Sequence, residues 1–193
     1  MKRRSTLLAL VICLATTISV QAQQQTLFEF DEPNAARQWQ TVNDGVMGGR
    51  SDGRFKINSA GNMEFFGNLS LENNGGFASV RARGSQFLLS KDDVITARVR
   101  GDGREYKFNV YAGRTMGGIS FRQSFQTKKD EWIEVQFPID RFVASWRGRT
   151  YADQKLDPTK ITGVGFLLGD KKPGPFKLEV EWIKGGPAER KIQ

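Results

Sequence analysis

Five segments of this chain alternate apolar and polar side chains with a period of two residues. They are residues 77–83, 94–101, 105–112, 131–137 and 176–183. In residues 105–112, for example, the apolar side chains of Tyr106, Phe108 and Val110 are separated by charged or polar ones. This period is typical of antiparallel strands with one buried face, because successive side chains of a strand point to opposite sides. The alternation therefore predicts an all-β protein.

Five further segments have the length and apolar content of short strands. They are residues 27–31, 53–57, 63–66, 118–126 and 161–169. Glycine, asparagine and aspartate clusters separate the segments, and only residues 33–39 and 139–142 resemble helices. About ten short antiparallel strands at this spacing indicate a β-sandwich of the jelly-roll type.

The N-terminus has the pattern of a secretory signal peptide. Three basic residues at positions 2–4 precede a short apolar run, and small residues lie at the cleavage positions before and at Ala22. We expect residues 1–22 to be removed, residues 23–184 to form one domain, and residues 185–193 to be a flexible tail. No other apolar run is long enough to span a membrane, so we expect a periplasmic or secreted product.

The composition excludes several chemistries. The chain has no histidine, and its one cysteine, Cys13, lies in the expected signal peptide. A Ser-His-Asp triad, a Cys-His pair, a disulfide and the usual zinc sites are therefore excluded. The net charge is +8, and loss of the three basic residues of the signal peptide leaves +5. We expect no cofactor, no metal and no catalytic residue, and we discount nucleic acid as a partner of an exported protein.

Three connections are polar and rich in glycine: residues 41–53, 67–84 and 98–108. The first lacks the residues of a phosphate loop and the acid spacing of a calcium loop, so we expect an ordered turn with Gly48 and Gly49 at positive φ. The connections suggest either a structural hydrogen-bond network or a set of oxygens that face a ligand or cation. The candidate members besides the two glycines are Asn43, Asp44, Glu72, Asn73, Asn74 and Asp102.

Arginine side chains alternate on the polar faces of two expected strands. Arg81 and Arg83 lie on the first, and Arg98 and Arg100 lie on the second. If the two strands are neighbours, their guanidinium groups form a cationic face that can clamp a carboxylate, sulfate or phosphate. A solvated face with glutamate partners on the adjacent strand is the alternative.

Two tryptophans differ in their expected environments. Trp182 shares the register of the apolar face of residues 176–183, so we expect it in the core. Trp146 lies in a polar segment beside Arg147, which suggests an exposed aromatic surface on which a sugar ring stacks, or ordinary loop packing.

Five motifs carry a resemblance to a known family. The segments VNDGVMGGRSDG, GNLSLENNGGFASVRA, RGDGREYKF, FPIDRF and GVGFLLGDKKPGPFKLEVEWI together resemble the complex I intermediate-associated protein 30 family, over about residues 28–183. The resemblance implies a galactose-binding-like β-sandwich and an assembly-factor role, since the mitochondrial members hold intermediates of complex I and are not known as enzymes.

We therefore expect a non-enzymatic exported module that binds a protein or glycan partner, and the sequence assigns no oligomeric state. The first alternative is a carbohydrate-binding module for cell-wall or acidic polysaccharide. The second is a hydrolase or lyase that uses carboxylates such as Asp44, Glu72 or Asp102.

Overall fold

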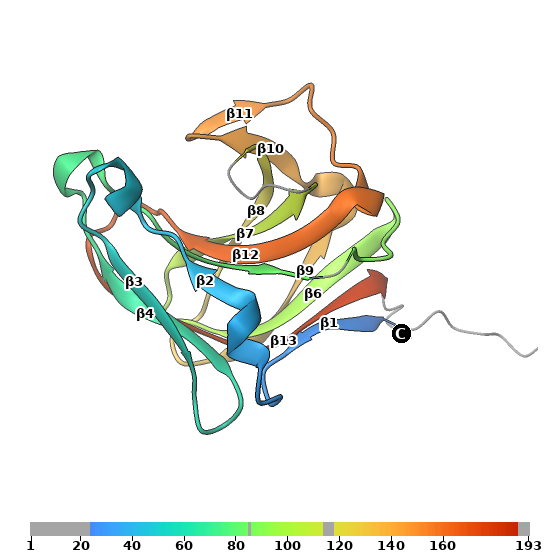
Figure 1. Cartoon of the computed structure of the whole chain (residues 1–193), viewed down its shortest axis with the longest axis horizontal. Coiled ribbons are helices and arrows are strands. Elements are labelled where there is room, and N and C mark those ends of the chain that lie inside the picture. Colours follow the sequence, from blue (N-terminus) through green and yellow to red (C-terminus); the bar gives the residue numbers. More distant parts are fainter. Residues whose placement is uncertain (1–23, 85, 114–117, 189–193) are drawn as a thin grey trace, which may run out of the picture.

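The computed structural model describes residues 24–84, 86–113 and 118–188, and these residues form two antiparallel sheets packed face to face (Figure 1). The expected signal peptide and most of the expected tail lie outside the described residues. The fold is all-β, as the alternation predicts, and its only helical pieces are single 3₁₀ turns in the described part of the chain.

The elements follow one another along the chain in this order. They are β1 (Gln25–Glu29), η1 (Ala35–Gln38), β2 (Trp39–Thr41), η2 (Asp44–Met47), β3 (Asp52–Ile57), β4 (Met63–Leu69), η3 (Glu72–Asn74), β5 (Ala78–Arg83), β6 (Asp93–Arg100), β7 (Glu105–Ala112), β8 (Ser120–Gln126), β9 (Trp132–Pro138), η4 (Ile139–Arg141), β10 (Val143–Trp146), β11 (Arg149–Tyr151), η5 (Pro158–Lys160), β12 (Ile161–Leu168) and β13 (Gly174–Pro187).

The first sheet is built around β13, the longest strand. Its order is β3-β4-β13-β6-β9, and β1 also pairs with β13. The second sheet has the order β11-β10-β8-β7-β12-β5-β2. Figure 1 shows that this second sheet is curved, with the β10–β11 hairpin raised at one edge and η2 beside the other.

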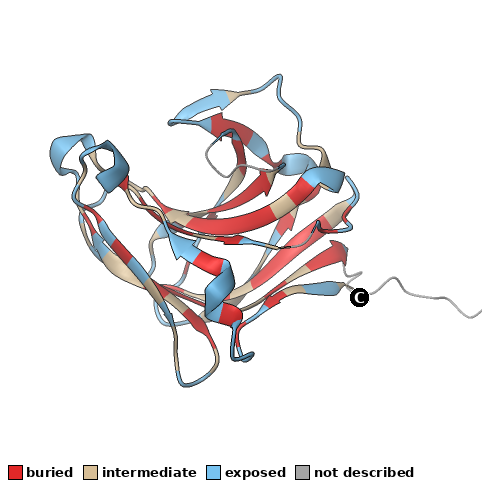
Figure 2. Cartoon of the chain, viewed as in Figure 1, coloured by how far each residue is buried: buried red, intermediate tan, exposed pale blue. Residues whose placement is uncertain are grey.

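The core fills the space between the sheets with apolar side chains that alternate along each strand (Figure 2). Phe108 on β7 stacks on Phe137 of β9 with 4.4 Å between ring centroids, and it meets Phe166 of β12 edge to face at 5.2 Å. Large aromatic side chains bury much surface each, so the Phe137 contact between the sheets and the Phe166 contact within one sheet stabilise the sandwich without disulfides.

The ten segments that the sequence predicts as strands are all strands in the structure. Three more strands are present: β2, β10 and β11. Each of these has only three or four residues, which is too short for alternation to stand out from the flanking loop. The prediction of an all-β, galactose-binding-like sandwich of the jelly-roll type is confirmed.

Two expectations about the C-terminal strand are wrong. Residues 185–187, which we placed in the tail, pair with β6 as part of β13, and Gly185 also pairs with Gln25 of β1. Trp182 is only half-buried. The register of β13 against β6 shifts between Val180 and Trp182, and this bulge reverses the phase of alternation so that Ile183 takes the core position instead.

Candidate functional site

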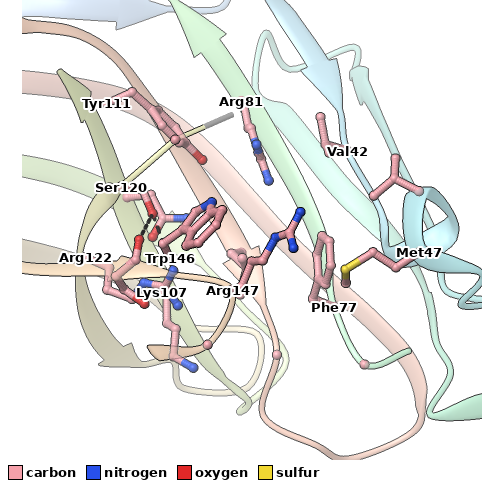
Figure 3. Close-up of a pocket in the computed structure, with 18 of the residues that line it drawn as sticks. Val42, Met47, Phe77, Arg81, Lys107, Tyr111, Ser120, Arg122, Trp146 and Arg147 are labelled. Carbon is pink, nitrogen blue, oxygen red and sulfur yellow. Dashed lines mark hydrogen bonds between the residues drawn. The ribbon is translucent and has the colours of Figure 1, made fainter. Parts of the chain in front are cut away.

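The candidate site is a groove of about 570 Å³ on the curved face of the seven-stranded sheet, away from the core. Its floor is made by side chains of β5, β7, β8 and β12 (Figure 3). One side is formed by Val42, η2 and the segment Gly76–Phe77, and the other by the end of β10 and the turn to β11. The groove is therefore a product of the sheet's curvature and of its two raised edges.

Strand alternation explains which side chains reach the groove. On β7, Tyr106 and Phe108 point into the core, so Lys107, Asn109 and Tyr111 point to the opposite face and line the groove. The same alternation turns Arg122 of β8 into it. A polar face that is solvated in many sandwiches is here enclosed by the raised edges.

The groove is strongly cationic. Five of its lining residues carry positive charge, and among the described lining residues none is acidic. The five are Arg81, Lys107, Arg122, Arg147 and Lys171. Burial lowers the pKa of Arg122; the Tyr111 hydroxyl opposes this effect, and the positive charge of Arg81 adds to it. These positive charges repel one another because no carboxylate among the described lining residues compensates them. The lining therefore favours an anionic ligand.

Aromatic rings lie beside these cations. The Arg147 guanidinium lies 4.8 Å from the ring centroid of Trp146, which is 40% exposed. The Arg81 guanidinium lies 5.5 Å from the ring of Tyr111. Burial raises the pKa of the Tyr111 hydroxyl, so this group is a neutral hydrogen-bonding group at any physiological pH. Together these side chains offer both flat apolar faces and hydrogen-bond donors.

The η2 side of the groove is held in place by Asp44, which is fully buried. Its carboxylate accepts four hydrogen bonds, two from Ser51 (N and Oγ) and one each from the backbone N–H groups of Gly76 and Phe77. These bonds tie η2 to β5 and fix Val46 and Met47 at the groove's rim, where they are 76% and 59% exposed.

Gly48 and Gly49, which follow Asp44 in the sequence, are required for different structural reasons. Gly48 has φ of +90°, as expected, and ends η2 in the left-handed region. Gly49 does not have positive φ; instead, a Cβ there would lie 2.5 Å from Asp44 Oδ1. The expectation of positive φ is wrong for Gly49, and its requirement is space for the carboxylate.

The structure separates the other members of the expected polar network. Asn43 donates from Nδ2 to the carbonyl of Gly53. Glu72 is exposed and forms a surface ion pair with Arg50 at 3.0 Å. The sequence analysis grouped these side chains with Asp44. It did not show that the Asp44 carboxylate is buried whereas the Glu72 carboxylate is exposed.

The remaining members have other places. Asn73 and Asn74, in η3 beside Glu72, adopt positive φ of 54° and 58°. Asp102 lies apart from the Asp44 cluster, where it accepts hydrogen bonds from the Arg104 backbone, the Tyr106 hydroxyl and the Lys177 backbone. The expected members therefore do not form a single network: Asp44 and Asp102 each accept hydrogen bonds in a separate cluster.

The expected cationic face of four arginines is wrong. The strands that carry Arg81 and Arg100, β5 and β6, belong to different sheets. Arg100 pairs with the buried Glu179 of β13 at 2.9 Å. Arg83 lines a separate shallow hollow near Lys160. Of the candidate contact residues, the structure brings only Arg81, Trp146 and Arg147 into the groove.

Sequence reasoning missed Lys107, Arg122 and Tyr111 as site residues. Alternation already put Lys107 on the polar face of its segment, but no sequence signal tells which strands lie side by side. The neighbours of β7 in the sheet are β8 and β12, and the latter is about fifty residues further along the chain. The groove is therefore a property of the sheet order.

The described residues contain no group of three or more acidic residues placed to hold a metal ion. No helix within them is long and apolar enough to cross a membrane.

The fold with this groove defines the class of protein. The family 11 carbohydrate-binding module of a cellulosomal cellulase from Clostridium thermocellum superposes with a TM-score of 0.65 at 16% identity, over 89% of this chain and 98% of the module. A second structure of that module, in complex with a β-1,3-1,4-mixed-linked tetrasaccharide, gives 0.60 at 17% identity over 88% and 98%. The class is thus a β-sandwich with the same architecture as these modules.

The family is given by sequence. Residues 28–180 match the family model of complex I intermediate-associated protein 30, and the chain belongs to this family. The mouse mitochondrial protein of that name is 28% identical over 186 residues, which are 85% of this chain and 56% of the mouse protein. This chain therefore spans little more than half the length of that relative.

Proposed function

We propose that this protein is an exported, non-catalytic binding module that holds a polysaccharide chain in the groove of its seven-stranded sheet. The observation that carries the proposal is the groove itself, an open trough that combines the exposed ring of Trp146 with many hydrogen-bond donors. Sugar rings bind to such surfaces by stacking their apolar faces on aromatic side chains while their hydroxyl groups form hydrogen bonds. The export of the protein rests on the signal peptide that the sequence predicts.

The likeness to carbohydrate-binding modules supports this choice of ligand. One of those modules is described in complex with a tetrasaccharide, and this chain shares its architecture at low identity. The five cations of the groove extend the argument, because they favour acidic polysaccharides over neutral ones.

A protein partner is the second candidate, and one observation favours it. Val46 and Met47 expose apolar surface at the rim of the groove, although the buried Asp44 beside them fixes their loop. Rigid, exposed apolar side chains are common at sites of protein contact. The relatives named complex I intermediate-associated protein 30 give a precedent for a protein-binding role.

Affinity electrophoresis of the signal-free protein through gels that contain polysaccharides tests the proposal. We expect retardation by at least one polysaccharide, and loss of retardation in Trp146→Ala with an unchanged melting temperature, because Trp146 is exposed. Trp132→Ala is the matched control, since Trp132 lies on the other sheet against Arg98 and Arg100.

Absence of retardation by neutral and acidic polysaccharides alike would contradict the proposal. Capture of an envelope protein that is lost in Val46→Asp and Met47→Asp, in the absence of polysaccharide binding, would establish the second candidate instead.

A further inference from the structure

Four side-chain positions form a straight row across the floor of the groove. Gly165 of β12 pairs with Arg81 of β5 on one side and with Asn109 of β7 on the other, and Asn109 pairs with Arg122 of β8. Directly paired residues of neighbouring strands point to the same face, so all four positions face the groove. Strands lie about 4.8 Å apart, which puts the two arginine Cα atoms about 14 Å apart, within reach of each other's side chains.

No side chain fits in the middle of this row, at Gly165. A Cβ at this position would lie 2.6 Å from the carbonyl oxygen of Val80 and 3.3 Å from Cγ of Arg81. The row therefore has an arginine at each end and a position without a side chain between them.

Two buried polar atoms of the row have no hydrogen-bond partner. They are Nε of Arg122 and Oδ1 of Asn109, and Asn109 is only 2% exposed. The Arg122 side chain donates from Nη2 to Ser120 Oγ in a hydrogen bond that is long, at 3.4 Å. An unsatisfied buried polar atom is unfavourable, so a pair of them on the floor of a groove marks a place where a ligand supplies the missing partners.

The two atoms ask for different partners. Arg122 Nε is a donor, so it requires an acceptor; Asn109 Oδ1 is an acceptor, so it requires a donor such as a hydroxyl. The positive charge of Arg122, close to that of Arg81 and without a described carboxylate in the groove, makes an anion the favoured acceptor. A ligand that satisfies both atoms carries an anionic oxygen and a hydroxyl group next to each other.

We propose that the Arg81–Gly165–Asn109–Arg122 row is a subsite for one acidic sugar residue, whose carboxylate or sulfate ester is bound by Arg122 and whose neighbouring hydroxyl donates to Asn109. The proposal rests on the proposed function, because it places this sugar residue within a polysaccharide chain in the groove. Arg81, which donates from Nε to Ser79 and lies over the ring of Tyr111, adds positive charge at the other end of the row.

Isothermal titration calorimetry with three sets of oligosaccharides tests the subsite. The sets are oligogalacturonides, the same oligomers with methyl-esterified carboxyl groups, and sulfate esters of neutral oligomers. We expect the acidic oligomers to bind at least tenfold more tightly than the esterified ones, and the comparison of the first and third sets identifies carboxylate or sulfate as the bound group.

Substitutions test whether the preference for acidic over esterified oligomers depends on the arginine at the end of the row. Arg122→Gln is expected to remove the tenfold preference while leaving the affinity for esterified oligomers unchanged. Arg83→Gln is the matched control, because this arginine lies on the same strand as Arg81 but lines a different hollow. If Arg122→Gln does not fold, the preference is measured on the unaltered protein instead. Acidic oligomers should then raise its melting temperature more than esterified ones do.

The two proposals fail in different ways. Equal binding of acidic and esterified oligomers, with no effect of Arg122→Gln, would overturn the subsite and leave the polysaccharide-binding function intact. No binding of any of the three sets, with retardation by another polysaccharide in the gels, would overturn the subsite alone. No binding of the three sets and no retardation by any polysaccharide would overturn both.

Discussion

Replacing Asp44 by asparagine tests whether the groove's η2 side is held by a buried carboxylate. In the folded protein, Asp44 Oδ2 accepts from Ser51 Oγ at 2.6 Å, from Gly76 N at 2.6 Å and from Phe77 N at 3.1 Å, while Oδ1 accepts from Ser51 N at 2.9 Å. An asparagine has one oxygen and one NH₂ group, so it cannot accept at both positions.

The loss of stability depends on how the asparagine amide is oriented, and the favoured orientation is the one that keeps more hydrogen bonds. With the asparagine oxygen at the Oδ2 position, three acceptor contacts remain and only Ser51 N loses its partner. An orphaned buried N–H costs about 1–3 kcal/mol, and the three remaining bonds lose the strengthening that a charged acceptor gives. We expect Asp44→Asn to lower the free energy of unfolding by about 2–4 kcal/mol, which a typical domain tolerates while remaining folded.

Urea denaturation followed by tryptophan fluorescence measures this difference. Glu72→Gln is the matched control, because it makes the same chemical change at an exposed carboxylate, and we expect it to change stability by less than about 0.5 kcal/mol. Equal midpoints for wild type and Asp44→Asn would refute the argument that this carboxylate holds the loop.

The pH dependence provides a second check. Burial by itself raises the pKa of Asp44, but the hydrogen bonds from Ser51, Gly76 and Phe77 outweigh it and hold the pKa below its ordinary value. A group with a lowered folded-state pKa contributes stability above its unfolded pKa, about 4, and loses it as the pH falls through the folded value. The stability difference between wild type and Asp44→Asn should therefore be constant from about pH 5 to pH 8 and narrow below about pH 4.

Three further outcomes are expected. Gly49→Ala should lower the melting temperature because its methyl group meets the buried carboxylate, whereas Gly45→Ala, with nothing within 4 Å of the added Cβ, should not; equal effects would contradict the packing argument. In the folded protein, the little-exposed guanidinium of Arg104 lies 2.7 Å from the Asp170 carboxylate. Asp170→Asn removes this ionic partner and should lower the free energy of unfolding by about 3 kcal/mol in urea denaturation. An unchanged midpoint would show that the ion pair is dispensable. Intact-mass measurement of exported protein should give a chain that begins at Gln23, and a mass that includes residues 1–22 would contradict cleavage.

The strands could be predicted because alternation is a local signal. A segment of seven or eight residues, such as β6 or β7, repeats the pattern often enough to be recognised, whereas β11 with three residues does not. The bulge in β13 was not predictable for the same reason: one extra residue leaves the local pattern of FKLEVEWI intact, and only pairing with β6 shows that Trp182 has changed sides.

The candidate site could be predicted only in part because it depends on which strands are neighbours. Trp146 and Arg147 stand out within one polar segment, and the structure places both in the groove. Arg100 shares its alternation pattern with Arg81, yet lies on the other sheet and pairs with Glu179. Equivalent local patterns thus lead to an ion pair in one place and to a groove lining in another, and tertiary pairing decides between them.

The position of β13 at the centre of its sheet has a consequence for the order of folding. This strand pairs with β4 over Gly174–Val180, and with β6 and β1 over its second half. β1 therefore cannot pair in this sheet until β13 is available. A nascent chain that still lacks residues 174–187 leaves β1 without a partner and β4 and β6 without the strand between them. Folding of this sheet must therefore follow the synthesis of β13, through contacts between residues about 150 positions apart, which is typical of slow-folding topologies.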